Sequence, residues 1–163
     1  MTYELQELAA DCREALRRDP GAEGREEVRV LVERACADAD FVRTHLGPEN
    51  EDPRKILYED PDLGFCIIAH AYRSMTDSRP HDHGPSWAIY GQAVGETEMV
   101  DWREVSPGRV EEARRYRLRP GDAWTYQEGD IHSPLRAGET RLLRVEGVNM
   151  DNVTERRWFD PVD

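Results

Sequence analysis

The segment Gly121–His132 reads GDAWTYQEGDIH and is the most informative part of this sequence. It contains a short run with two aromatic residues, 123–126, between turn signals at 119–122 and 127–130, with a histidine two residues after the second turn. A short run bounded by Gly, Asp and Pro is typical of a β-strand between tight turns. The segment therefore predicts a turn–strand–turn unit that leads His132 into a further strand.

The same pattern continues through most of the chain after about residue 50. Further strands are expected at 54–58, 64–72, 86–94, 97–104, 113–118 and 140–149, with additional turns at 59–62 and 106–109. Many short strands at regular spacing indicate an all-β sandwich or barrel.

Two amphipathic helices are predicted ahead of the strands. Apolar residues recur at steps of three and four over 3–18 and 24–46, and the turn residues at 19–21 and 47–48 end these stretches. We expect a single domain over residues 1–163, with a helical layer at 1–47 and a β-barrel at 53–160.

The composition argues against several classes of function. The 163 residues carry 34 acidic and 22 basic side chains, a net charge of −12, which is unfavourable for binding a phosphate backbone or an anionic membrane. Neither a long apolar run nor a signal-peptide pattern is found in this sequence. Three widely spaced cysteines favour a reducing compartment over a disulfide framework, so we expect a cytoplasmic protein.

The sequence His81-Asp82-His83 offers two imidazoles at alternate positions. Alternate residues of a strand point to one face, so the pair could share one metal ion, with His132 as the third ligand. An isolated pair of this kind also occurs by chance on exposed strands, which is the structural alternative.

The spacing around His132 resembles the second motif of the cupin superfamily. That motif reads Gly, five residues, Pro, one residue, Gly, two residues, His, and here Gly121, Gly129 and His132 match it. Gln127 stands where proline is usual. The resemblance implies a double-stranded β-helix, or jelly-roll barrel, with two N-terminal α-helices in this chain.

The first cupin motif is matched in part. His81, His83 and Gly95 fall in place, whereas Ala88 occupies the position of the family's glutamate ligand and Met75 that of an earlier glycine. The resemblance therefore implies a metal site of three histidines and no carboxylate. Neutral nitrogen ligands suit Fe(II), the metal we expect, and Ni, Mn, Cu and Zn remain open.

Among cupins, a site of three histidines is similar to that of the thiol dioxygenases, the cysteine dioxygenase type. This implies a dioxygenase that uses O2 on a small substrate bearing a thiol, a carboxylate or both. A lyase, isomerase or hydrolase on the same site is the first alternative, and a cupin that binds a small molecule without catalysis is the second. A homodimer is a further expectation from the superfamily.

The family's carboxylate-binding residue falls on Arg54 or Lys55 by its offset from the histidine pair; a solvated hinge is the alternative for both. Trp87 and Tyr90 lie close to the motifs and are candidates for pocket walls, with Tyr90 also a candidate catalytic residue. Packing in the barrel core is the alternative for both aromatic residues.

The strand expected at 140–149 departs from the family. Arg144, Glu146 and Val148 occupy the positions of a serine–histidine–tyrosine relay, and a cysteine–tyrosine crosslink cannot form because its cysteine position is Ala88. The charged pair faces either solvent, the usual arrangement of an alternating strand, or a polar cavity. In a cavity, Arg144 would hold an acidic substrate or pair with Glu146. Glu146 would orient a ligand, act as a base or bind an amine.

Two histidines are expected to be structural. His70 lies on a mostly apolar strand, which favours a core or pocket-edge position, and His45 lies near a helix C-terminus, where a partly cationic ring complements the helix dipole.

Overall fold

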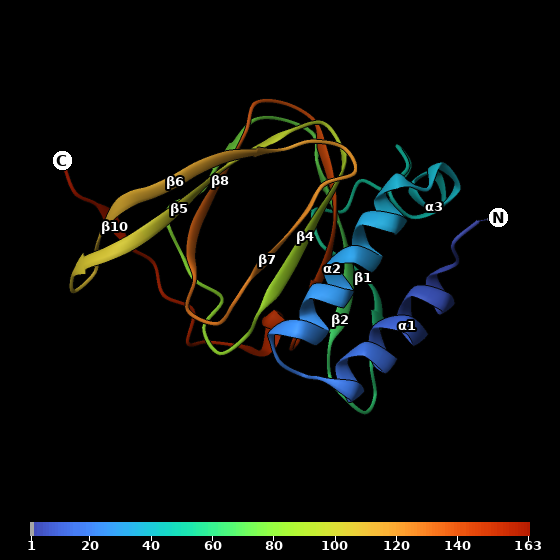
Figure 1. The fold of residues 1–163 in the computed structure, drawn as a ribbon. Helices are drawn as coiled ribbons and strands as arrows, with labels where there is room; N and C mark the ends of the chain where they lie inside the picture. The colour runs from blue at the N-terminus through green and yellow to red at the C-terminus, as the bar shows by residue number, and fades with distance from the viewer. Residues whose placement is uncertain (1) are drawn as a thin grey trace.

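The computed structural model describes residues 2–163, which form a helical layer followed by two β-sheets (Figure 1). The helices are α1 (Leu5–Arg18), α2 (Ala22–Ala37) and α3 (Ala39–His45). The strands are β1 (Lys55–Glu59), β2 (Cys66–Tyr72), β3 (Thr76–Asp77), β4 (Ala88–Val94), β5 (Thr97–Ser106), β6 (Arg109–Leu118), β7 (Ala123–Tyr126), β8 (Ile131–Arg136), β9 (Thr140–Glu146) and β10 (Asp160–Pro161), with a 3-10 turn, η1 (Met150–Asn152), before β10.

The strands form two five-stranded sheets that curl around a common interior. Their orders are β1-β2-β9-β4-β7 and β10-β6-β5-β8-β3, so neighbours in each sheet are mostly distant in sequence. The pairing is antiparallel except between β10 and β6. This is the double-stranded β-helix, and the predicted fold class is confirmed.

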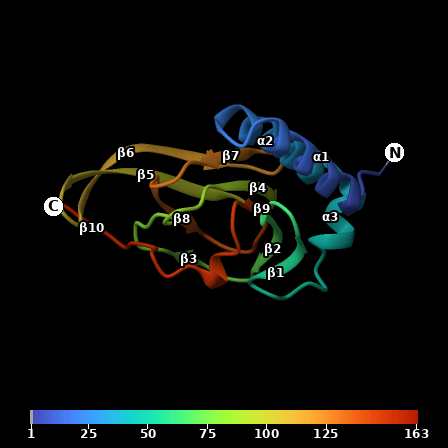
Figure 2. The same cartoon turned by 90° about the horizontal axis from the view of Figure 1, so that it is seen from below.

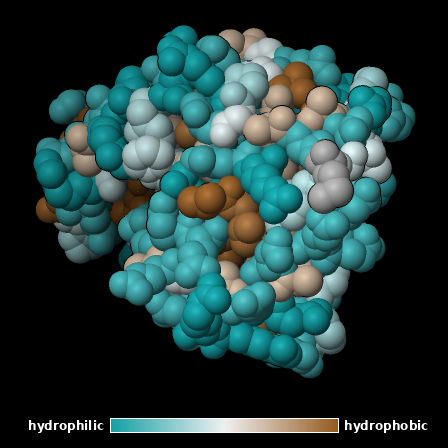
Figure 3. Space-filling view, turned by 45° about the vertical axis from the view of Figure 1, so that its right-hand side comes forward, coloured by the Kyte–Doolittle hydropathy of each residue, from teal (hydrophilic) through white to brown (hydrophobic). Residues whose placement is uncertain are grey.

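The helices cover the outer face of the first sheet (Figure 2). The buried stripes of α1 and α2 meet alternate residues of the strands, among them Ile67, Ile89, Leu143 and Val145, in one apolar core. Gly91 on β4 permits the close approach of α2, because a Cβ there would lie 2.4 Å from a methyl carbon of Val32. Seen from outside, the helical side is largely hydrophilic around a small apolar patch (Figure 3).

The range 24–46, predicted as one helix, comprises α2 and α3. They meet at Asp38, whose backbone is extended and whose carboxylate accepts hydrogen bonds from the amides of Asp40 and Phe41. Aspartate at an N-cap stabilises the start of a new helix, which explains the break. None of the helices in residues 2–163 has the length and apolar character of a membrane span.

The strand prediction is close but incomplete. Every predicted range overlaps an observed strand, while β6 begins at Arg109, four residues ahead of the predicted range 113–118. A strand was expected after the turn at 127–130, and it is β8. The two-residue strands β3 and β10 lie outside every predicted range. Such short strands carry too few residues for an alternating pattern.

The barrel interior differs from the helix-side core because buried ionisable side chains lie beside its apolar residues. The polar side chains that point into it include four histidines, two arginines and one glutamate, all buried except Arg144, whose side chain is 12% exposed: His70, His81, His83, His132, Arg136, Arg144 and Glu146. Buried ionisable groups are rare unless they are paired, hydrogen-bonded or bound to a ligand. The interior is therefore the place to look for a functional site.

Candidate metal centre

Two of the predicted ligands are joined through their backbones. The amide of His81 donates to the carbonyl of His132, and the amide of His132 donates back to the carbonyl of His81, each at 3.0 Å. Their ring centroids are 4.8 Å apart. This antiparallel β-bridge thus brings together two histidines that are far apart in the sequence.

His83 completes the group. Its Nε2 atom lies 3.1 Å from Nε2 of His132, and one ligand atom from each of the three histidines lies within 4.8 Å of the others. Two nitrogen atoms bound to one ion at about 2.1 Å are separated by about 3.0–3.4 Å in octahedral or tetrahedral geometry. The His83–His132 pair has this spacing, so the three histidines could hold one transition-metal ion, and within residues 2–163 no carboxylate joins this group.

The environment keeps the three imidazoles uncharged. Burial lowers the pKa of His81 to about 4 and lowers the pKa of His83 and of His132 well below the ordinary value. Nδ1 of His81 lies 2.7 Å from the carbonyl oxygen of Arg79, so Nδ1 carries the proton and Nε2 is left as the donor atom. A neutral imidazole oriented by a backbone carbonyl is the form that binds metals.

The segment that carries the histidine pair is not the regular strand that the alternation predicts. Only His81 forms a β-bridge, and the chain turns at Gly84, where φ is +59°. Asp82 points to the C-terminal segment instead, accepting hydrogen bonds from the amides of Gly84 and Arg157 and an ion pair from the Arg157 guanidinium at 3.1 Å. The carboxylate of Asp82 therefore holds the loop in place.

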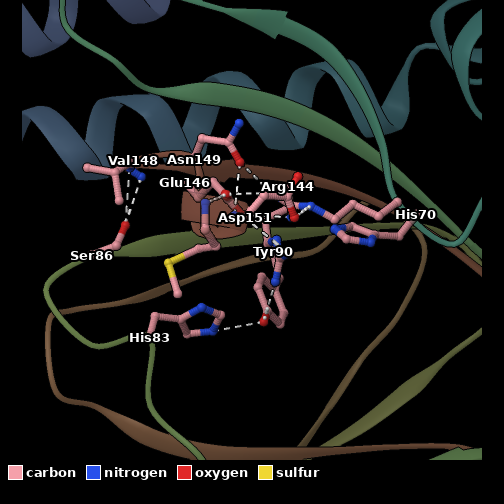
Figure 4. Close-up of polar contacts among 12 residues, drawn as sticks. His70, His83, Ser86, Tyr90, Arg144, Glu146, Val148, Asn149 and Asp151 are labelled. Carbon is pink, nitrogen blue, oxygen red and sulfur yellow. Dashed lines mark hydrogen bonds and ion pairs between the residues drawn. The ribbon is translucent and has the colours of Figure 1, made fainter. Parts of the chain in front are cut away.

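A chain of polar contacts leads from the histidines to β9 (Figure 4). The hydroxyl of Tyr90 lies 3.0 Å from Nε2 of His83, and the Arg144 guanidinium donates to that hydroxyl at 3.0 Å. Arg144 also lies 3.2 Å from the carboxylate of Glu146. The Tyr90 hydroxyl therefore lies beside one of the candidate ligand atoms.

Glu146 is fully buried and held on every side. Arg54 donates to both of its carboxylate oxygens, at 3.1 and 2.9 Å, and the amide of Met150 donates at 2.7 Å. The preferred interpretation of the alternating strand, with Arg144 and Glu146 in solvent, is wrong. The helices cover the face that carries the apolar residues of β9, and the charged residues point into the barrel.

Two of the proposed substrate-binding residues lie elsewhere. Trp87 packs in the helix-side core, with the Arg25 guanidinium 5.4 Å from its ring, because it points to the opposite face of the chain from Ala88. Lys55 is exposed at the start of β1, whereas its neighbour Arg54 reaches Glu146. Of the two alternatives for the basic residue, the structure brings only Arg54 into the barrel.

The remaining histidines are separate from the metal group. Nδ1 of His70 lies 2.6 Å from the carbonyl oxygen of Pro53, and its buried Nε2 has no partner within residues 2–163. The ring of His45 lies 4.7 Å from that of Phe41, tilted against it, in the helical layer. His70 is therefore a buried residue of the polar interior that lies outside the metal group. A core position and a pocket-edge position were both expected for it.

A buried charge of the barrel interior, Arg136, was missed from the sequence. Arg136 on β8 is 4% exposed and lies four residues beyond His132 on the same face of the strand. The period-two alternation that places His132 inside the barrel also places Arg136 there, so the signal was present in the sequence.

Known proteins resemble this chain in structure and not in sequence. No protein-family profile and no curated protein matches this sequence. Among solved structures, the chain is similar to a cupin superfamily protein from Desulfitobacterium hafniense, with 12% identity and a TM-score of 0.46 over 59% of this chain and 76% of that one. It is also similar to KdgF from a Halomonas species, with 19% identity and a TM-score of 0.49 over 61% of this chain and 82% of that one. A third similar structure is an uncharacterized conserved protein with a double-stranded β-helix domain from Klebsiella pneumoniae, with 15% identity and a TM-score of 0.49 over 69% of this chain and 89% of that one. At these identities the likeness assigns no activity to this chain.

Proposed function

We propose that the protein is a mononuclear non-haem metal dioxygenase with His81, His83 and His132 as the ligands and Fe(II) as the metal. Its substrate is a small molecule that bears a thiol, a carboxylate or both. The observation that carries the proposal is the donor set: three buried, uncharged imidazoles converge with no carboxylate among them.

A neutral donor set leaves the full charge of a divalent ion uncompensated. When bound there, Fe(II) supplies redox chemistry with O2 and open coordination positions for an anionic donor of the substrate. Ala88 contributes no carboxylate at its place on β4, opposite Glu146 on β9. The proposal therefore favours an anionic substrate donor such as a thiolate or an enolate oxygen.

The residues around the histidines orient the reacting partners. Tyr90 presents its hydroxyl beside the His83 donor atom, where it can give a hydrogen bond or a proton to a bound substrate. Arg144 donates to that hydroxyl from the other side, which leaves the phenol O–H free to donate. Glu146 holds Arg144 in turn, and is a positioning residue in this proposal.

The alternative of non-oxidative chemistry requires Glu146 to act as the base. Its two oxygens already accept hydrogen bonds from Arg54 and from the amide of Met150, and Arg144 adds an ion pair. Both carboxylate oxygens are thus occupied as acceptors, and neither is free to approach a substrate proton. The contacts therefore favour the dioxygenase over this alternative.

The test combines metal analysis with oxygen uptake. Anaerobic reconstitution of the full chain with Fe(II) is expected to give one ion per chain, and His132→Ala is expected to lower the affinity for the metal by at least about 100-fold through loss of a ligand. His45→Ala is the matched control, because that histidine lies in the helical layer, and it is expected to retain the metal.

Oxygen uptake separates the candidate functions. We expect the Fe(II) protein to consume O2 in proportion to product formation with one class of thiols or enolisable carboxylates. Turnover without O2 consumption would replace the proposal with lyase, isomerase or hydrolase chemistry, and ligand binding without any turnover would identify a binding protein. Tight retention of one metal ion by the His132→Ala protein would exclude the three-histidine site itself.

A further inference from the structure

The charged groups of the barrel interior do not balance. Arg54 and Arg144 face two carboxylates, those of Glu146 and Asp151, through ion pairs of 2.9 to 3.2 Å. Arg136 is buried in the same interior, and it forms no ion pair with any carboxylate in residues 2–163. An unpaired charge inside a protein is costly, so this guanidinium needs an explanation.

The contacts of Arg136 hold the side chain but do not neutralise it. Its Nη1 atom donates to the hydroxyl of Thr76 at 3.2 Å, and its Cζ atom lies 4.3 Å from the ring centre of Tyr72. Nε is buried and has no acceptor within the described chain. The guanidinium is therefore oriented by an aromatic ring on one side and a hydroxyl on another, with one donor left over.

Arg136 lies on β8, the strand that also carries the candidate metal ligand His132. It follows His132 on the same inward face of β8. Burial lowers the pKa of Arg136, and the titratable groups near enough to affect that pKa include Tyr72, Tyr90 and Arg144. Tyr90 is the residue whose hydroxyl lies at His83. The unpaired cation thus faces the same interior as the metal ligands.

We propose that Arg136 binds the carboxylate of the small molecule that the metal centre acts on. The guanidinium edge that includes Nε suits a carboxylate, which accepts two parallel hydrogen bonds from such a fork. The inference rests on the proposed function only in taking this ligand to be the substrate of the metal site. It assigns the carboxylate to a residue of β8.

This assignment departs from the position that the family resemblance implies. Arg54 stands at that position, but its guanidinium is already held by Glu146, Asp151 and Asn149. A substrate carboxylate would have to displace these partners. Arg136 offers an unpaired donor without any such exchange.

Arg156 is the internal competitor for this role. Its Nε donates to the carbonyl oxygen of Asp82 at 3.2 Å, and its guanidinium has no carboxylate partner in residues 2–163. The side chain is only half buried, so water solvates part of its charge. Leaving the guanidinium without a carboxylate partner is therefore more costly at Arg136, which is buried, than at Arg156.

The test compares matched probes that differ in charge. The full chain is loaded with Co(II), whose absorption changes when a thiolate binds, and is titrated with mercaptocarboxylates and mercaptoalcohols of the same two to four carbons. The wild-type protein is expected to bind the carboxylates about 10- to 100-fold more tightly, as for a charge-assisted bidentate pair. Arg136→Gln is expected to abolish this preference, and Arg156→Gln to preserve it.

Other outcomes decide against the proposal. A preference for carboxylates that survives in Arg136→Gln, or that is lost in Arg156→Gln, would overturn it. If Arg136→Gln does not fold, Arg136→Lys replaces it, because lysine keeps the charge without the planar fork. We expect that variant to lose most of the preference, and full retention would equally contradict the assignment.

A second titration separates this inference from the proposed function. Calorimetry with glutarate and its neutral diamide needs neither a thiol nor oxygen. Binding of glutarate that depends on Arg136, without any effect of thiols on the Co(II) spectrum, would support the carboxylate site and count against the thiol dioxygenase. Thiolate binding that is independent of Arg136 would support the dioxygenase and overturn the carboxylate site.

Discussion

The two faces of the sheet β1-β2-β9-β4-β7 have opposite chemistry. On β9, Leu143 and Val145 point to the helices and pack in an apolar core, whereas Arg144 and Glu146 point into the barrel and join a polar network. Leu143, Val145 and Glu146 are buried, and the side chain of Arg144 is 12% exposed. The comparison shows that one strand can divide its residues between stability and chemistry by alternation alone, provided that both faces are covered.

The largest effect on stability is expected from the helix-side face. Leu143→Ala removes a fully buried side chain from the apolar core and should lower the free energy of unfolding by about 2–5 kcal/mol. Urea titration monitored by circular dichroism measures this change. Metal stoichiometry should remain at the wild-type value. A variant that unfolds normally but fails to bind metal would show that the two faces are not independent.

A smaller loss of stability and a larger loss of function are expected from the barrel-side face. Glu146→Gln keeps the shape but leaves Arg54 and Arg144 without the shared carboxylate, which should lower the free energy of unfolding by about 1–3 kcal/mol. Because Arg144 then no longer fixes Tyr90, turnover should fall while metal binding is retained. Activity unchanged from wild type would remove Glu146 from the list of positioning residues.

The smallest effect is expected on the pH dependence of stability, through the contact between Arg13 of α1 and Asp60 in the β1–β2 turn. Burial opposes ionisation of Asp60, but hydrogen bonds from the Leu63 amide, the Tyr58 hydroxyl and the Arg13 guanidinium prevail, and the pKa of this carboxyl falls to about 2. A lowered pKa stabilises the fold above the ordinary value of 3.8, and this contribution is lost as the pH falls toward 2.

Urea midpoints measured between pH 5 and pH 2.5 check this sign. The wild-type protein should lose more stability than Asp60→Asn over that range, because the variant has no carboxyl to titrate. Parallel pH profiles for the two proteins would show that this contact between α1 and the β1–β2 turn does not contribute.

Much of the fold and the histidine group could be predicted because both depend on local spacing. Turn residues at regular intervals indicated the strands, and the positions of Gly121, Gly129 and His132 indicated a third ligand. The direction of Arg144 and Glu146 could not be predicted in the same way. Alternation separates two faces of a strand but does not say which face is covered, and here the helices cover the one that an isolated barrel would expose to water.

Two further features lay in the sequence without being used. The residue Arg136 follows His132 by an even number of positions, so one inward residue implies the other. Asp38 precedes Asp40 and Phe41 as an N-cap and marks the break between α2 and α3. The partner of Arg54 belongs to a different strand, and no local pattern relates such distant residues.

The close contact between α2 and β4 at Gly91 has a consequence for any attempt to reduce the molecule to its barrel. Ile67, Ile89, Leu143 and Val145 form one continuous apolar surface beneath the helices. Chains from which residues 1–47 have been deleted would present that surface to water and associate through it. The helical segment thus acts as a built-in shield against self-association, and the barrel depends on it for an independent existence in solution.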